Sequence, residues 1–246
     1  MDSCLDCINF SGSKRSLRIN LCLGDRLFWH RPGAEDYRGN RADWPAFIER
    51  FMDREKVTDI VLLGEQRYAH KVAIASAKVR GITVVATDFG YLRPDWITFE
   101  RDGMSGDSLF PRDPDVIKDL AAQVPPPDLG RKYRDHFPRQ ARWDMLYHLS
   151  SSLLWFLYPG YKSHQVHHPA LVYIGTGLRI LKNKLTRRSA AELVEEMRNR
   201  DKPYYVFPLQ MQNDFSVRAY SDFDGLEPAI RQVVGSFAEH APQDAH

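Results

Sequence analysis

The feature that most constrains the fold is a strand–helix–strand pattern in the first third of the chain. The β-branched run Asp59–Leu63 stops at Gly64 and has the composition of a buried parallel strand. Residues 68–80 are rich in alanine and other good helix formers, and Gly81 stands where a helix-ending glycine belongs. A second apolar run covers residues 82–86. This order predicts two parallel strands joined by a right-handed helical crossover, and therefore an α/β fold.

We divide the rest of the chain by composition. The predicted regions are a polar, poorly ordered start at residues 1–17, a Rossmann-like domain at 18–124, a linker with a basic and aromatic helical segment at 125–200, and the start of a second Rossmann-like domain at 201–246. Three consecutive prolines mark the linker. In the last two regions we expect a helix that begins at Ser189 with a capping box to Glu192, a strand over residues 204–209, and an amphipathic helix over Leu226–His240.

The overall charge gives no general case for nucleic-acid binding, because 34 basic side chains nearly balance 32 acidic ones. Residues 129–200, however, hold 13 Lys and Arg against 5 Asp and Glu. This segment indicates contact with phosphates, acidic sugars or an anionic membrane surface; a solvated basic helix is the alternative. We find no signal peptide and no apolar run long enough to span a bilayer. We therefore expect a cytoplasmic protein, with peripheral attachment to the inner membrane as the second interpretation.

Neither cysteine nor histidine clusters predict a metal site. Cys4 and Cys7 have the spacing of half a zinc site, but no second pair follows at a suitable distance. His164 and His168 would have to share a helix that Pro169 interrupts. We expect no metal and no cofactor.

Polar clusters follow the predicted strands at three places, namely residues 64–67, 88–100 and 210–214. Ligands of open α/β sheets bind beyond the carboxyl ends of strands, so these clusters are candidate site residues. The second cluster is the most informative, because it combines Asp88, Asp95 and Glu100 with Arg93 in a loop shaped by glycine and proline. Such acids serve in catalysis, or they cap a helix or pair with an arginine.

Residues 88–103 carry the pattern acidic-x-Gly-Tyr-Leu-Arg-Pro-x-Trp-(Ile/Val)-Thr-x-Glu-x-x-Gly. This pattern resembles the signature of the capsule polysaccharide biosynthesis and export family, and residues 24–29 and 206–214 agree with that family as well. The likeness extends over residues 18–242. It implies a GT-B-like fold with two Rossmann-like parallel sheets, and a glycosyltransferase that adds β-Kdo from CMP-Kdo to a lipid acceptor anchoring the capsule polysaccharide.

The resemblance also implies roles for single residues. Asp214 is implied as the nucleophile of a retaining double displacement, and Asp88 as the acid/base that activates the acceptor hydroxyl. The implied substrate-binding residues are Arg67, Arg93, Glu100, Gln210, Gln212 and Asn213. For Arg93, pairing with the Kdo carboxylate and a salt bridge to Asp95 or Glu100 are both open. The implied partners are CMP-Kdo, a lipid acceptor at the membrane surface and other capsule assembly proteins, and not nucleic acid.

Two departures from the family pattern modify these expectations. Relatives usually have Glu where this chain has Asp88, which shortens the reach of the carboxylate. Relatives also have a strand and helix before residue 24, and a strand with a His-Pro motif beyond the region of this chain. We therefore expect a chain truncated at both ends, with an incomplete second half, weak CMP binding and no transfer by itself. A catalytically inactive export or scaffold component is the alternative function.

Overall fold

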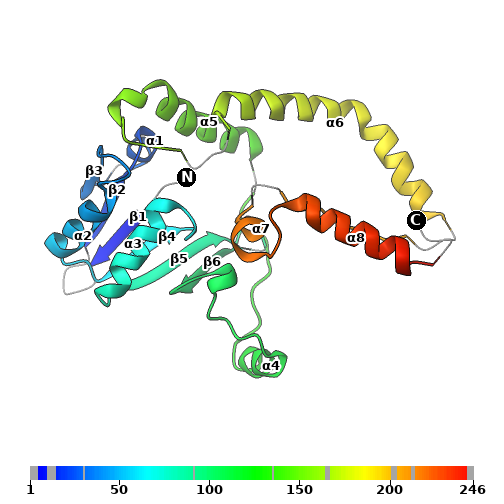
Figure 1. Cartoon of the computed structure of the whole chain (residues 1–246), viewed down its shortest axis with the longest axis horizontal. Helices are drawn as coiled ribbons and strands as arrows, with labels where there is room; N and C mark the ends of the chain where they lie inside the picture. The colour runs from blue at the N-terminus through cyan, green and yellow to red at the C-terminus, as the bar shows by residue number, and fades with distance from the viewer. Residues whose placement is uncertain are drawn as a thin grey trace. The chain divides into compact units, whose positions relative to one another are not determined.

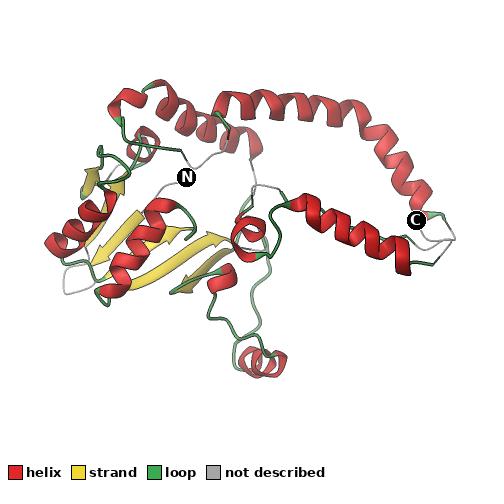
Figure 2. Ribbon diagram, in the orientation of Figure 1, coloured by secondary structure: helices red, strands yellow, loops and turns green. Residues whose placement is uncertain are grey.

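The computed structural model describes residues 5–9, 15–29, 31–90, 92–134, 136–163, 167–200, 204–211 and 214–242, and for residues 5–9 it describes the backbone alone. The chain divides into two compact units, Met1–His164 and Gln165–His246. Each unit is described by itself below. Figure 1 labels the helices and strands, and Figure 2 colours them by type.

The first unit is a mixed α/β structure built on a six-stranded sheet with the order β3-β2-β1-β4-β5-β6. The strands are β1 (Leu5–Asn9), β2 (Arg15–Asn20), β3 (Ala34–Asp36), β4 (Asp59–Leu63), β5 (Thr83–Phe89) and β6 (Ile97–Arg101). β1 is antiparallel to both β2 and β4, and β6 is antiparallel to β5. β2 and β3 are parallel, as are β4 and β5. β2, β3, β4 and β5 therefore all point the same way, and their carboxyl ends lie at one edge of the sheet.

The predicted strand–helix–strand unit is confirmed. β4 pairs in parallel with β5 from Asp59 opposite Thr83 to Leu63 opposite Thr87, and α3 (Tyr68–Val79) connects them. α3 ends as expected, because Gly81 takes a left-handed backbone conformation with φ of 66° that costs glycine little. The fold class read from this pattern is therefore correct for the first unit.

One face of the sheet carries the hydrophobic core. α2 (Trp44–Glu55) and α3 pack against it, as Figures 1 and 2 show. The strand side chains that point into this core alternate along the chain, as a period of two requires. They are Leu17 and Ile19 on β2, Ile60 and Leu62 on β4, and Val84 and Ala86 on β5. The indole Nε1 of Trp44 is buried and donates to the carbonyl of Ala69 at 3.0 Å, which joins α2 to the start of α3.

The remaining elements of the first unit surround this sheet. They are α1 (Leu23–Leu27), the 3₁₀ turns η1 (Ser105–Asp107) and η2 (Trp155–Leu157), α4 (Pro114–Ala122) and α5 (Phe137–Leu153). α5 packs against α1, which directly follows β2. The polar segment at residues 1–17 was expected to lack regular structure, and this is wrong for β1 and for the first half of β2. Strand pairing with β4 gives this segment a structure that its composition does not indicate.

The described part of the second unit is helical. Its helices are α6 (Pro169–Arg198), α7 (Phe215–Tyr220) and the predicted α8 (Leu226–His240). The expected helix start at Ser189 is wrong, because α6 runs through this position without a break. Good helix formers flank it on both sides, and Arg188 pairs with Glu192 one turn further on. Within the described ranges, none of the helices has the length and hydropathy needed to cross a bilayer.

The strand predicted at residues 204–209 is also wrong, since these residues form no regular element. Their side chains are exposed, with 76% of Val206 and 61% of Tyr205 accessible. A β-branched and aromatic run forms a strand only when another strand accepts its hydrogen bonds. The described residues of this unit contain no such strand.

Candidate functional site

The carboxyl edge shared by β2, β3, β4 and β5 gathers the polar loops of the first unit. α1 follows β2 there, residues 37–43 follow β3, residues 64–67 follow β4, and Asp88 lies next to the end of β5. Residues 64–67 and the start of the 88–100 cluster therefore lie at one edge, where α/β folds bind their ligands, whereas Glu100 lies on β6 opposite Ala86. The third cluster, residues 210–214, does not follow a strand in the described chain.

Asp88 is exposed at this edge. It lies on the same face of β5 as Val84 and Ala86, which are buried in the core, but two residues beyond Ala86. Its Oδ1 accepts a hydrogen bond of 2.7 Å from the backbone nitrogen of Phe89. This contact is local to the chain, so the carboxylate remains available to a ligand in solution.

The carboxylates of Asp95 and Glu100 in the 88–100 loop are engaged within the unit. Asp95 Oδ1 accepts from the backbone nitrogens of Lys132 at 2.9 Å and Tyr133 at 2.7 Å. Glu100 accepts a short hydrogen bond from the Ser108 hydroxyl. Asp95 thus holds the segment before α5, and Glu100 holds the turn after η1. Neither carboxylate is placed as a free ligand group.

Arg93 is exposed and its guanidinium lies over the ring of Phe89, 5.1 Å from the centroid. Within the part of the chain that the structure describes, it forms no salt bridge with Asp95 or Glu100. The stacking on Phe89 brings Arg93 to the strand end that also carries Asp88. A bidentate contact with a ligand carboxylate is therefore still open to it.

The cluster that follows β4 is more deeply placed. Glu65 is buried, and its Oε2 accepts from the backbone nitrogen of Met104 at 3.1 Å. Arg67 is half-buried at the N-cap position of α3. Its positive charge acts on Tyr161, whose pKa burial raises far above the usual range while Arg67 opposes the rise. Glu65 therefore fixes the loop, and the charge of Arg67 acts on the segment after η2.

The predicted nucleophile, Asp214, caps a helix. Its Oδ1 accepts from the backbone nitrogen and the hydroxyl of Ser216, at 2.9 and 2.7 Å, at the start of α7. Its Oδ2 accepts from Gln210 Nε2 at 2.9 Å, so these two predicted site residues are in contact. Gln212 and Asn213 lie outside the described residues. Asp88 belongs to the first unit and Asp214 to the second, so a common cleft for them stays a prediction.

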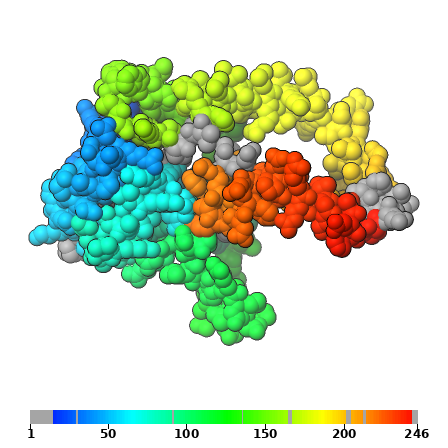
Figure 3. Space-filling model, viewed as in Figure 1, coloured from blue at the N-terminus to red at the C-terminus, as the bar shows by residue number. Residues whose placement is uncertain are grey.

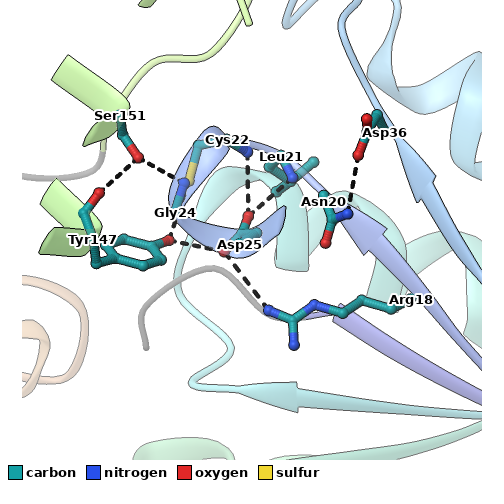
Figure 4. A network of polar contacts seen from close by, with 9 residues as sticks. All are labelled: Arg18, Asn20, Leu21, Cys22, Gly24, Asp25, Asp36, Tyr147 and Ser151. Atoms are coloured by element: carbon teal, nitrogen blue, oxygen red, sulfur yellow. Dashed lines mark hydrogen bonds and ion pairs between the residues drawn. The ribbon is translucent and has the colours of Figure 1, made fainter. Parts of the chain in front are cut away.

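A buried polar network at the end of β2 was not among the predicted site residues (Figure 4). Its centre is Asp25, which is 1% exposed. Oδ2 accepts from the backbone nitrogens of Leu21 at 2.9 Å and Cys22 at 3.2 Å. Oδ1 accepts from the Tyr147 hydroxyl at 2.8 Å and lies 3.9 Å from Nη2 of Arg18. One carboxylate therefore ties β2 and α1 to α5.

This network accounts for the sequence at residues 24–29. Gly24 donates its backbone N–H to the Ser151 hydroxyl at 2.9 Å. Phe28 packs edge-on against Trp143 with ring centroids 5.6 Å apart, and Arg18 lies over the ring of Trp29 at 5.1 Å. The motif thus builds the junction between α1 and α5. In the sequence, only the motif at residues 24–29 marked this junction. Its partner residues on α5 are remote in sequence, so the motif did not identify them.

The environment of this junction keeps its hydroxyl and thiol protonated. Burial, and then the neighbouring Asp25 carboxylate, raise the pKa of the Tyr147 hydroxyl far above its usual range. The same two causes raise the pKa of the Cys22 thiol, whose Sγ donates to the Tyr147 hydroxyl oxygen at 3.3 Å. A buried, protonated thiol is a poor nucleophile, so the junction positions structure and does not supply covalent chemistry.

Replacing Gly24 by Ala should destabilise the first unit by about 2 kcal/mol, because overpacking forces buried groups apart. A Cβ at this position would lie 2.5 Å from Cδ2 of the Tyr147 ring. The free energy of unfolding in urea measures the effect. Gly175→Ala in α6 is the control, since a Cβ there meets nothing within 4 Å. Equal stability of the Gly24→Ala variant and wild type would show that the junction is not tightly packed.

No group of three or more His, Cys, Asp or Glu side chains able to hold a metal is found among the residues that the structure describes. This finding tests only in part the prediction that the Cys4/Cys7 and His164/His168 pairs bind no metal. Cys4 and His164 lie outside the described residues, and only the backbone of Cys7 is described.

The fold defines a mixed α/β protein whose polar loops gather at the carboxyl edge of its sheet. Residues 58–246 match the model of the family described as "capsule polysaccharide biosynthesis protein". The chain therefore belongs to the capsule polysaccharide biosynthesis protein family, as the motif at residues 88–103 indicated. No solved structure matches the chain.

Curated relatives agree with this family. The chain is 28% identical over 228 residues to the capsule polysaccharide export protein KpsS of Escherichia coli, covering 91% of this chain and 57% of that protein. It is 25% identical over 234 residues to the capsule polysaccharide modification protein LipB of Neisseria meningitidis serogroup A, covering 93% of this chain and 56% of the relative. The chain thus spans a little over half the length of the curated relatives it matches.

Proposed function

We propose that this protein takes part in capsule polysaccharide assembly as a glycosyltransferase that moves β-linked Kdo from CMP-Kdo to a lipid acceptor. The observation that carries the proposal is the exposed carboxylate of Asp88. It stands at the carboxyl end of a parallel strand, inside the motif that characterises the family. Arg93, stacked beside it on Phe89, is suited to the carboxylate of an acidic sugar.

The proposed reaction proceeds in two displacements. The Asp214 carboxylate attacks the anomeric carbon of Kdo, and the bond to the CMP phosphate oxygen breaks with its electron pair, releasing CMP. The acceptor hydroxyl then attacks the same carbon, Asp88 takes its proton, and the Asp214 carboxylate leaves. Gln210, which donates to Asp214, would hold the nucleophile in place. The overall configuration at the anomeric carbon is retained.

The proposed lipid acceptor accords with the surface of α6, the yellow helix in Figure 3. An exposed apolar stripe runs along it at helical spacing. Its members are Leu171, Ile174, Leu178, Leu181 and Leu185, each more than half exposed. By helical periodicity Lys182, Lys184 and Arg188 flank the stripe, and Arg179 and Arg187 lie on the opposite side of the helix. Such a combination favours attachment to an anionic membrane surface, where the acceptor would be found.

The test is product formation from CMP-Kdo and a lipid acceptor, measured by mass spectrometry of the lipid and by release of CMP. We expect Kdo-bearing lipid and CMP to appear in equal amounts. The assay is run on the 246-residue chain and on a longer protein containing it. Product from the short chain would overturn the expectation that it does not transfer Kdo by itself. Absence of product from both preparations would contradict the proposed function.

A capsule export component without catalysis is the second candidate. The Escherichia coli relative is named as an export protein, which favours this candidate, as does the engagement of Asp214 as a helix cap. This candidate predicts that the Asp88→Asn variant still restores surface capsule in a strain lacking its own homologue. The transferase proposal predicts that the variant fails to do so.

A further inference from the structure

A groove at the carboxyl edge of the sheet holds two cationic side chains that the proposed reaction does not use. It lies between the loop after β3, the first residue of α3 and the segment after η2. Its volume is about 470 Å³, within the range of small-molecule sites. The residues that matter for its chemistry are Asn40, Arg41, Tyr68, Gly160 and Lys162. All of them belong to the first unit.

The charged side chains that line the groove are all positive. Arg41 and Lys162 are positive, and no acidic side chain is among its described lining residues. Within the described ranges, neither cation forms a salt bridge with a carboxylate. Two unneutralised cations in one concavity raise the local concentration of anions, because low-dielectric walls focus their field.

Arg41 is held in position by Tyr68. Its guanidinium carbon lies 3.8 Å from the centroid of the Tyr68 ring, and the Tyr68 hydroxyl donates to the Arg41 carbonyl at 3.2 Å. The neighbouring carbonyl of Asn40 accepts from the Tyr37 hydroxyl at 2.5 Å. An arginine fixed in this way loses little side-chain freedom when it binds a planar or tetrahedral anion.

The two walls of the groove meet through the backbone. A Cβ at Gly160 would lie 1.8 Å from the carbonyl oxygen of Gly39, so only glycine allows this approach. The contact places Lys162 opposite the loop that carries Arg41. The N-terminus of α3, which begins at Tyr68, adds the partial positive charge of a helix start to the same groove.

We propose that this groove binds the phosphate group of a phosphate ester, with Arg41 and Lys162 as its charged contacts. The fork of an arginine and the point charge of a lysine together suit the three free oxygens of a phosphate. The volume leaves room for a polyol or nucleoside attached to that phosphate. The site is separate from Asp88, and the proposal does not depend on Kdo transfer.

Titration with inorganic phosphate at constant ionic strength, with chloride as the replaced ion, tests the site. Binding is followed by the backbone NMR signals of residues 40–42 and by calorimetry. We expect saturable binding by the wild type and about a tenfold rise in Kd for Arg41→Gln and for Lys162→Gln, as expected for loss of one charge-assisted contact. Arg41→Lys should weaken binding less than Arg41→Gln. Lys78→Gln, at the other end of α3, should leave the Kd unchanged.

CMP and glycerol 3-phosphate then distinguish a nucleotide from a lipid headgroup as the source of the phosphate. If CMP or glycerol 3-phosphate binds more tightly than inorganic phosphate, the tighter compound identifies the source. Equal affinity for CMP, glycerol 3-phosphate and inorganic phosphate supports a site for the phosphate alone. If Arg41→Gln fails to fold, Lys162→Gln decides, because its side chain is exposed at the rim. Absence of saturable phosphate binding, or an equal Kd for Lys162→Gln and Lys78→Gln, would overturn the proposal.

Discussion

Replacing Asp25 by Ala is expected to lower the free energy of unfolding of the first unit by about 3 to 5 kcal/mol, the usual range when one partner of a buried charged network is removed. The substitution leaves the buried N–H of Cys22, the partly buried N–H of Leu21 and the Tyr147 hydroxyl without this acceptor. It also removes the carboxylate from the side of Arg18, whose side chain is only 10% exposed. Urea denaturation followed by near-ultraviolet circular dichroism measures the loss.

Two further variants define the cause of this loss. Asp25→Asn keeps one acceptor oxygen, so it should cost less than Asp25→Ala. Asp115→Ala removes an acid on α4 that is 86% exposed and pairs with Lys118, and it should change stability by less than about 0.5 kcal/mol. If Asp25→Ala costs no more than Asp115→Ala, Asp25 does not hold β2, α1 and α5 together.

If the proposed Kdo transfer uses Asp88 as its general base, replacing Asp88 by Asn should reduce the transfer by about a thousandfold, because loss of such a base costs between two and four orders of magnitude. The measurement uses whichever preparation forms Kdo-bearing lipid, the 246-residue chain or a longer protein containing it. The melting temperature should stay within about 2 °C of wild type. The reason is that Asp88 is exposed and its described contact is with the adjacent backbone nitrogen.

Two matched variants serve as controls for Asp88→Asn. Asp88→Glu keeps the carboxylate on a side chain one methylene longer and should retain more activity than Asn. Asp95→Asn alters an acid of the same loop that binds backbone amides, and it should affect stability more than the rate of transfer. A normal transfer rate for Asp88→Asn would remove Asp88 from the proposed mechanism.

The parts of the fold that could be predicted are those with a local cause. The pattern from Asp59 to Gly81 places apolar residues, helix formers and a glycine stop in an order that few other folds accommodate. The parallel direction of β4 and β5 follows from the same residues, and it places Asp88 at the strand end. The fold class and the edge that carries the candidate site were therefore open to sequence reasoning.

The parts that could not be predicted depend on remote partners. Tyr147 donates a hydrogen bond to Asp25, which lies 122 positions away in the chain, and no local sequence pattern predicts this contact. Residues 204–209 have strand composition but no strand beside them in the described chain. Asp214 has the residue type of a nucleophile and equally of a helix cap, and the structure gives it the second role in the second unit. Composition cannot separate these alternatives, because both use the same carboxylate.

The central position of β1 imposes an order on folding during synthesis. β1 ends at Asn9, yet one of its two neighbours, β4, begins only at Asp59. The hairpin of β1 and β2 can form as soon as it leaves the ribosome, but the other side of β1 must wait until β4 has been made. During that interval, β1 presents an open row of hydrogen-bonding groups to other chains. The nascent protein is therefore most prone to aggregation before its fourth strand has emerged.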